Sequence, residues 1–329
     1  MRGIQMYFRI IISLSMIFLV SGISAQTLDE ATTLYNEGGT AVQEGNIELA
    51  IQKFNDCISI CKTLYEEEED MDAESLMTSI QEKLPKLYFQ LSVNKLKEKD
   101  ISTGLEYAIK AKELSEEYGD SETLNKSVEL LGKVYYSIGL SKYKAQELDE
   151  ALVQLDKAIA EDNNLKAHNL KLVILKDKAE DVLLIEASKA AVAAAEAAND
   201  FEYKDKFIQF VATYFYNAGV LAKQSSDYDT AIKKLLTSLD FNAENSDAYY
   251  LLAAIYNSRS DWDNAINAAN EGLKYVTNGS QAKFYYELGN AYYGKGDNDA
   301  ACEAYSNAAV GEYTENAKYQ MEQVVKCNE

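Results

Sequence analysis

Apolar and small residues recur at helical spacing along most of this chain, and the pattern is clearest between Ser246 and Ala308. Two copies of one pattern begin there 36 residues apart, at Ser246 and Ala282. The first copy carries Tyr249, Leu252, Ala253, Tyr256, Trp262, Ala265, Ala269 and Gly272. The second copy carries Tyr285, Leu288, Gly289, Tyr292, Gly296, Ala301, Tyr305 and Ala308. A repeat of this length predicts pairs of helices that cannot bury their apolar faces alone and must stack on their neighbours.

This order of residues resembles the tetratricopeptide repeat, a helix-turn-helix unit of about 34 residues. Small residues let the two helices of a unit approach closely, and large residues fill the gaps beside them. The resemblance implies an all-α fold, an α-solenoid of stacked antiparallel helix pairs, with about seven units and a C-terminal capping helix. Weaker copies carry their first large residue at Leu34, Tyr88, Tyr135 and Phe215.

The strength of the pattern divides the chain into segments. Residues 26–163 carry three units, residues 201–313 carry the C-terminal units, and residues 314–329 form the capping helix. Residues 164–200 are either a degenerate helix pair or a flexible break; Leu172 and Leu183 need burial, which favours the pair. Pro85 either opens the first helix of the second unit or kinks a longer helix that begins near Ala73.

The first 25 residues differ from the rest of the chain. Arg2 and Arg9 precede an apolar run, and small residues follow it up to Ala25. This order is typical of a secretory signal cleaved after Ala25, which leaves Gln26 as the new terminus. The alternative is a short membrane anchor, but the run is too short to span a bilayer comfortably. We therefore expect an exported protein of the periplasm with no membrane insertion after cleavage.

Composition adds constraints on partners and on the cysteines. The formal net charge of −21 disfavours nucleic acid as a partner; it either serves the solubility of an exported protein, which is the favoured interpretation, or attracts a basic partner. Cys57 and Cys61 are four residues apart on a predicted helix, where their β-carbons are too distant for a good disulfide, so we expect two core thiols. Cys302 and Cys327 either form a disulfide that staples the last unit to the capping helix or stay apart.

The resemblance implies a binding groove lined by the first helix of each pair. The fifth position of the repeat points into that groove, and here it is aromatic in six units. The predicted groove residues are Tyr35, Phe89, Tyr136, Tyr143, Tyr216, Tyr250, Asn257, Tyr286, Asn290 and Tyr293. The six fifth-position rings either form a ladder for a ligand or serve ordinary repeat packing. They are Tyr35, Phe89, Tyr136, Tyr216, Tyr250 and Tyr286. The family's carboxylate clamp is not expected, because Val220 and Ala254 stand where it needs polar residues.

Catalytic and metal chemistry has little support. The single histidine, His168, is expected to be a partly exposed helix residue, and without a second one the usual zinc sites and histidine triads are missing. The acidic run at residues 66–70 lacks the alternating ligands of a calcium loop and is interpreted as a solvated helix end. We expect no catalytic residue, no metal and no cofactor.

These observations favour a non-enzymatic scaffold or adaptor that binds an unknown partner protein or peptide in its groove. The first alternative is a protein that binds a glycan or cell-wall fragment, because tyrosine rings also stack on sugars. An enzyme would need a site that the sequence does not show. Self-assembly into a homo-oligomer through the ends of the helix stack is the remaining alternative.

Overall fold

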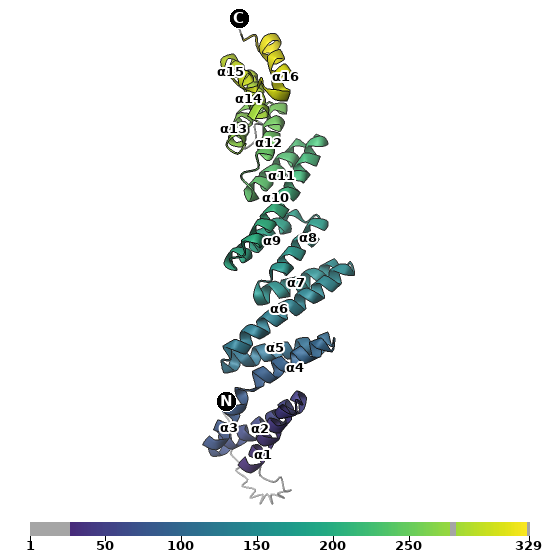
Figure 1. Ribbon diagram of the computed structural model, residues 1–329, viewed down its shortest axis with the longest axis vertical. Coiled ribbons are helices and arrows are strands. Elements are labelled where there is room, and N and C mark those ends of the chain that lie inside the picture. The colour runs from purple at the N-terminus through teal and green to yellow at the C-terminus, as the bar shows by residue number, and fades with distance from the viewer. Residues whose placement is uncertain (1–26, 277–280, 328–329) are drawn as a thin grey trace, which may run out of the picture. The chain divides into compact units, whose positions relative to one another are not determined.

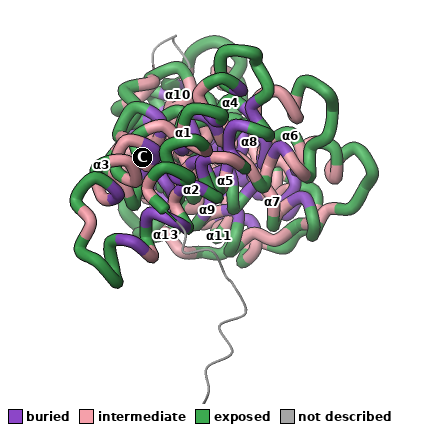
Figure 2. Tube along the Cα trace, turned by 90° about the horizontal axis from the view of Figure 1, so that it is seen from below, coloured by how far each residue is buried: buried purple, intermediate pink, exposed green. Residues whose placement is uncertain are grey.

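The computed structural model describes residues 27–276 and 281–327, and all regular structure within these ranges is helical (Figure 1). The predicted signal segment lies outside the described residues. The chain divides into two compact units, residues 1–131 and 132–329, and helix α6 (Ser121–Lys144) crosses the boundary between them. The α-helices bury one side and expose the other, which is the pattern of helices that pack on one face, and Figure 2 shows buried and exposed stretches following one another along the trace.

The first unit contains two helix pairs and one additional helix. The pairs are α1 (Leu28–Gln43) with α2 (Ile47–Glu68), and α4 (Leu84–Lys97) with α5 (Ile101–Tyr118). The additional helix, α3 (Met71–Gln81), packs against α2 and α1. Pro85 lies in the first turn of α4 and opens that helix, because the amide hydrogen it lacks has no partner within a first turn.

The second unit continues the same plan. It contains α7 (Leu148–Asp162), α8 (Leu165–Asp177), α9 (Asp181–Ala197), α10 (Phe201–Gln224), α11 (Tyr228–Phe241), α12 (Ser246–Ser258), α13 (Trp262–Leu273), α14 (Gln281–Lys295) and α15 (Asn298–Ala308). After α15 come the short helix η1 (Gly311–Tyr313), α16 (Thr314–Tyr319) and the π-helix η2 (Gln320–Val325). The fold is therefore all-α and built from stacked helix pairs, as predicted.

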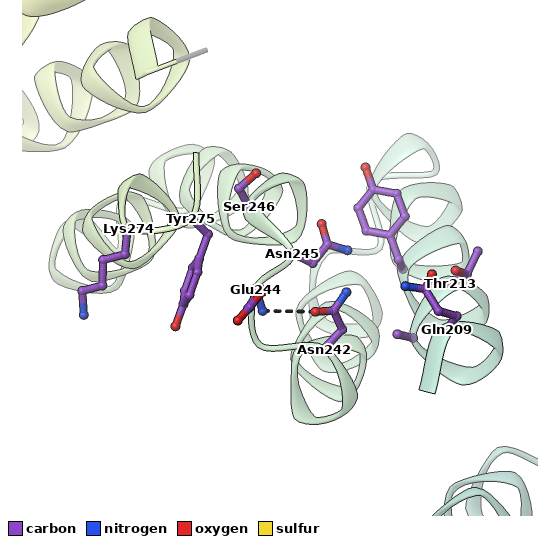
Figure 3. Close-up of a pocket in the computed structure, with 10 residues that line it drawn as sticks. Gln209, Thr213, Asn242, Glu244, Asn245, Ser246, Lys274 and Tyr275 are labelled. Atoms are coloured by element: carbon purple, nitrogen blue, oxygen red, sulfur yellow. Dashed lines mark hydrogen bonds between the residues drawn. The ribbon is translucent and has the colours of Figure 1, made fainter. Parts of the chain in front are cut away.

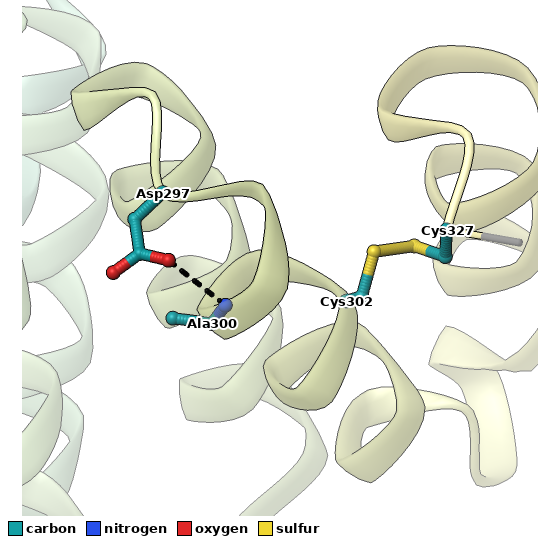
Figure 4. The surroundings of a disulfide bond; sticks show 4 residues. All are labelled: Asp297, Ala300, Cys302 and Cys327. Atoms are coloured by element: carbon teal, nitrogen blue, oxygen red, sulfur yellow. Dashed lines mark hydrogen bonds between the residues drawn. A yellow bond between two sulfur atoms is a disulfide. The ribbon is translucent and has the colours of Figure 1, made fainter. Parts of the chain in front are cut away.

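The turns inside the helix pairs share one geometry. Each has one residue with a positive φ angle, and the next residue begins the second helix as its N-cap. Seven such turns lie in the described ranges, and their positive-φ residues are Gly45, Lys99, Gln146, Ala179, Ser226, Ser260 and Gly296. In several of them an Asp or Asn cap accepts a hydrogen bond from the helix backbone, as Asp297 does from Ala300 in Figure 4. Only two of the seven positions are glycine, which explains why the sequence pattern is weak at the others.

Close packing within each pair depends on glycine and alanine. A β-carbon at Gly219 would lie 2.7 Å from Leu235 Cγ, and one at Gly289 would lie 2.6 Å from the Tyr305 ring. The ring of Tyr305 is 1% exposed and Leu235 is fully buried. These small residues therefore fix how near the two helices of a pair can come.

Residues 164–200 form the packed helices α8 and α9. Leu172 and Leu184 are buried in a cluster that also contains Phe207 of α10. Leu183, in contrast, is 49% exposed, so the expectation that it is buried was wrong. The alanine-rich face of α9, including Ala191 and Ala195, is buried in the same cluster. This helix pair thus lacks the repeat pattern because alanine replaces the large residues of its second helix, α9. Its buried core is nevertheless continuous with that of α10.

The C-terminal segment covers the last helix pair. Ala317 of α16 and Val325 of η2 are buried in one cluster with Tyr305 and Ala308 of α15. Cys302 and Cys327 form a disulfide that ties α15 to the end of this segment (Figure 4). The two other cysteines, Cys57 and Cys61, are free and buried in the first unit.

Candidate functional site

The candidate site lies on the second unit, on the face formed by the first helices of its last three pairs. Helices α10 and α12 contact each other, and so do α12 and α14. Tyr216, Tyr250 and Tyr286 come from α10, α12 and α14 in turn, and each is partly exposed. We call the surface that carries these three tyrosines the tyrosine face. Burial raises the pKa of Tyr216, and the carboxylate of Asp247 raises it further.

At its C-terminal end the tyrosine face is covered by a residue of η1. The ring of Tyr313 lies 5.4 Å from that of Tyr286, and its hydroxyl is 3.4 Å from the hydroxyl of Tyr250. Tyr286 also packs edge-on against Tyr305, at 5.6 Å between ring centres. Burial raises the pKa of Tyr250, and its contact with Tyr313 adds to the shift. The aromatic surface is thus packed at this end and more open around Tyr216.

A charged pair lies between the first two tyrosines. Lys283 of α14 donates to Asp247 of α12 over 2.5 Å. The same ammonium lies 5.1 Å from the centre of the Tyr250 ring, within range of a cation–π interaction. The ion pair with Asp247 holds the Lys283 ammonium over the Tyr250 ring. The hydroxyl of Tyr250 lies near that of Tyr313.

A buried carboxylate lies beside Tyr250 on the same face. Glu287 of α14 is 8% exposed, and its Oε2 accepts hydrogen bonds from Asn257 Nδ2 at 2.7 Å and Asn290 Nδ2 at 3.3 Å. Asn290 is itself held by the hydroxyl of Tyr305, which donates to Asn290 Oδ1 over 2.7 Å. Burial raises the pKa of Glu287, while the two amide donors act in the opposite direction. We call Asn257, Glu287 and Asn290 the carboxylate–amide cluster.

A polar hollow of about 590 Å³ opens next to Tyr216 (Figure 3). Its walls come from α10, from the loop between α11 and α12, and from the residues after α13. The lining includes Gln209, Thr213, Asn242, Glu244, Asn245, Ser246, Lys274 and Tyr275. The Tyr275 ring is stacked on that of Tyr249, 6.0 Å between centres, so one wall is a fixed aromatic surface.

A second hollow of similar volume lies four helices earlier in the same unit. It is lined by Tyr136 of α6, by Asn163 and Asn164 in the loop between α7 and α8, and by Tyr203 of α10. Tyr136 and Tyr216 hold equivalent places, because α6 and α10 are both 24 residues long and each is followed by a similar set of three helices. The two hollows therefore repeat one arrangement of an aromatic residue and an Asn-containing loop.

The other predicted groove residues are divided between the two units. Tyr35 and Phe89 belong to the first unit, and the Tyr35 hydroxyl contacts Ser79 Oγ at 3.0 Å and accepts from Lys83 Nζ at 3.2 Å. These contacts lower the pKa of Tyr35. Tyr143 of α6 is partly exposed, and Tyr293 of α14 is exposed. Tyr216, Tyr250, Asn257, Tyr286 and Asn290 come from the contacting helices α10, α12 and α14, and Tyr293 lies two helical turns after Tyr286 on the same side of α14.

The histidine departs from the expectation. His168 is only 4% exposed, whereas we expected a partly exposed helix residue. Its ring lies 6.4 Å from Phe207, because α8 packs against α10 through residues the faded repeat pattern did not identify. Burial, with the nearby Lys171, lowers the pKa of His168 to about 4. It is a neutral core residue at neutral pH.

Neither a metal cluster nor a membrane-spanning helix is found in the described ranges. No three of the described His, Cys, Asp and Glu side chains are grouped to hold a metal ion. The acidic run at residues 66–70 ends α2 at Glu68, and Asp70 caps α3 by accepting from the amides of Asp72 and Ala73. None of the described helices has the length and apolar character to cross a bilayer.

Sequence reasoning missed Glu287, Lys283, Tyr275 and Tyr313. Glu287 stands on a helix face that is otherwise filled by ordinary repeat positions, and nothing in the repeat marks a buried acid there. Tyr313 follows the last repeat, so no earlier unit offers a position to compare it with. The one available signal was Asn290, a predicted groove residue one turn after Tyr286 on the same helix.

A family model described as tetratricopeptide repeat matches residues 282–309, which comprise most of α14 and α15. No curated protein matches the chain. Among solved structures, a crystal structure of MamA is 22% identical and covers 59% of this chain and 96% of its own, with a TM-score of 0.29. YrrB, titled a TPR protein with an unusual peptide-binding site, is 17% identical over 56% of this chain and 90% of its own, with a TM-score of 0.30.

The TPR2AB domain of yeast Sti1, in a complex with pHSP90, is 14% identical over 91% of this chain and 96% of its own, with a TM-score of 0.32. At these TM-scores the superpositions say nothing about a partner for this chain.

Proposed function

We propose that the chain is a non-enzymatic scaffold that binds a segment of another protein on its tyrosine face, and the match of residues 282–309 to the tetratricopeptide repeat supports this. The observation that carries the proposal is the placement of Tyr216, Tyr250 and Tyr286 on three consecutive first helices, each partly exposed. Tyrosines provide large rigid contact area and a polar tip at low conformational cost, so they are frequent at binding hot spots.

The test is to replace Tyr216 and Tyr250 by alanine, singly and together. We expect partner binding to fall at least about tenfold for each variant, since hot-spot truncations cost about 2 kcal/mol or more. Retention of a partner from envelope extract and thermal unfolding are measured in parallel. Tyr319→Ala is the control, because it removes an exposed ring from α16, away from the tyrosine face. Equal losses of binding and stability in the groove variants would mean that these rings serve packing alone.

A second candidate is a glycan or cell-wall fragment, and the hollow beside Tyr216 supports it. Tyr216 and Tyr275 provide ring faces, while Gln209, Asn242 and Asn245 provide amide groups. Rings with amides around them suit the apolar faces and hydroxyls of a sugar. A glycan array with the wild-type chain and with Tyr275→Ala distinguishes the candidates. A glycan signal lost in that variant supports this one, and its absence together with a stoichiometric protein partner supports the scaffold.

We propose that the protein acts outside the cytoplasm, in the periplasm. Two observations support this location: the signal-like order of residues 1–25 and the disulfide between Cys302 and Cys327, since disulfides persist in oxidising compartments. The mass of the protein purified from its native cells tests it. We expect a chain that starts at Gln26 with Cys302 and Cys327 oxidised. A chain that still carries Met1, or reduced Cys302 and Cys327, would contradict the location.

A further inference from the structure

The carboxylate–amide cluster contains one buried acceptor that lacks a donor among the described residues, the Oδ1 of Asn257. Asn257 uses its Nδ2 to donate to both the carbonyl oxygen and the Oε2 of Glu287, at 2.9 and 2.7 Å. Its own Oδ1 is buried and has no hydrogen-bond partner in the part of the chain that the structure describes. A buried acceptor without a donor destabilises the folded chain, and a donor from a bound partner would remove that cost.

The charge of Glu287 also lacks an immediate counterion. Among the described residues no lysine or arginine nitrogen forms an ion pair with it, and its partners are two neutral amides. Lys223, at the end of α10, is the cation whose charge acts on Glu287. A nearly buried carboxylate without a paired cation is unfavourable, and supplying the cation would relieve that cost.

The surroundings of the cluster favour a planar cation with several donors. A guanidinium group presents five N–H donors in a fixed plane, which suits a carboxylate and a neighbouring amide oxygen together. Tyr250 lies close enough for the charge of Glu287 to raise the pKa of its hydroxyl. The Lys283 ammonium already lies over the Tyr250 ring, so the guanidinium would be held by the acceptors of the cluster and not by that ring. The acidic net charge of the whole chain would attract such a group.

We propose that the carboxylate–amide cluster is a specificity pocket that receives an arginine side chain of the bound partner, with Glu287 and Asn257 Oδ1 as the acceptors. The inference rests on the proposed function, because it assumes a partner segment on the tyrosine face. It adds a chemical requirement on the sequence of that partner, which the three tyrosines alone do not impose.

The direct test uses N-acetyl-L-argininamide as the probe and the side-chain amide NMR signals of Asn257 and Asn290 as the readout. We expect saturable shifts of both signals in the wild-type chain. The matched control is N-acetyl-L-citrullinamide, which has nearly the same shape but a neutral urea group, and we expect it to bind at least about tenfold more weakly. Glu287→Gln keeps the size of the side chain and removes its charge, so it should weaken argininamide binding by a similar factor.

Equal binding of the two probes, unchanged binding by Glu287→Gln, or no shift with argininamide would each overturn the proposal. Lys223→Gln tests the chain's own competitor: if Lys223 normally occupies the pocket, this variant should bind argininamide more tightly than the wild type. Circular dichroism and thermal unfolding establish that each variant is folded.

A peptide-display selection separates this inference from the proposed function. The wild-type chain and Glu287→Gln are screened against the same random dodecapeptides. Arginine enriched at one position with the wild type and not with the variant supports the pocket. Peptides whose binding depends on Tyr216 but shows no arginine preference would contradict the arginine pocket and would still support the scaffold function. Absence of any peptide that depends on Tyr216 would count against the scaffold, and the argininamide titration would still decide the pocket.

Discussion

At the scale of single residues, the buried His168 makes the stability of the folded chain depend on pH. Its ring is packed beside Phe207, and its Nε2 has no hydrogen-bond partner among the described residues. Burial and Lys171 favour the neutral form, while Asp156 favours the charged one to a smaller extent. The folded protein therefore holds the neutral imidazole down to a pH near 4, whereas the unfolded chain binds a proton near pH 6.5.

The resulting prediction is a loss of stability as the pH falls from 6.5 to 4. In that window the unfolded chain binds more protons than the folded one, so the free energy of unfolding decreases; above pH 6.5 the contribution is fully present. At pH 4.5 the loss amounts to about 2–3 kcal/mol relative to pH 7. Urea unfolding of the wild type and of His168→Leu at both pH values measures it. The pH dependence of the variant should be smaller by that amount, and identical pH dependences would refute the buried neutral state.

Residue by residue, the sequence predicted the side chains that obey the repeat and failed at those that do not. Gly289 and Tyr250 were identified because their neighbours recur in other units. His168 and Glu287 were not, because burial of a polar side chain depends on which helices pack on it from outside the unit. A repeat pattern contains that information only where the neighbouring units also follow the pattern.

At the scale of helices, two adjacent glycines in α1 have different roles: one is needed for close packing, and the other only lowers the helix propensity. A β-carbon at Gly38 would lie 2.6 Å from the ring of Phe54, which is 1% exposed, whereas one at Gly39 would meet no atom within 4 Å in the described part of the chain apart from its chain neighbours and the backbone of its own helix. Gly38 therefore permits α1 and α2 to approach. Gly39 only weakens the helix, since glycine costs about 1 kcal/mol relative to alanine.

We therefore predict opposite effects for two neighbouring substitutions. Gly38→Ala should destabilise the chain by about 1–3 kcal/mol, because the ring of Phe54 has to shift in a closely packed core. Gly39→Ala should stabilise it by about 0.5–1 kcal/mol. Chemical denaturation of both variants is the measurement. A stabilising Gly38→Ala would show that α1 and α2 are not packed as closely as described.

The elements that sequence reasoning did not foresee are those outside the regular pairs. Helix α3 was recognised only as a helical-looking stretch before Pro85, since it belongs to no repeat and packs on α2 as an extra layer. The capping helix was predicted, but not its final turn, which widens into the π-helix η2 next to the disulfide. Helix α3 and the π-helix η2 each depend on contacts with one particular neighbour, so no recurring sequence pattern predicts them.

At the scale of the whole molecule, the surplus of acidic residues bears on recognition. Many lysines already form ion pairs with carboxylates, such as Lys53 with Glu37 and Lys204 with Glu196. The remaining negative charge gives the −21 of the chain and favours a basic partner, with affinity that falls as salt rises. This agrees with a pocket that accepts arginine beside the tyrosine face.

The most direct measurement of the central claim is photo-crosslinking from the tyrosine face. Benzoylphenylalanine is placed at Tyr216, and in a matched variant at Leu236, an exposed residue on the second helix of the same pair. Each variant is expressed in the native cells and irradiated. The account predicts one discrete adduct from position 216, suppressed when Tyr250→Ala is added, and none from position 236. Adducts of equal yield from both positions, or none from position 216, would contradict it.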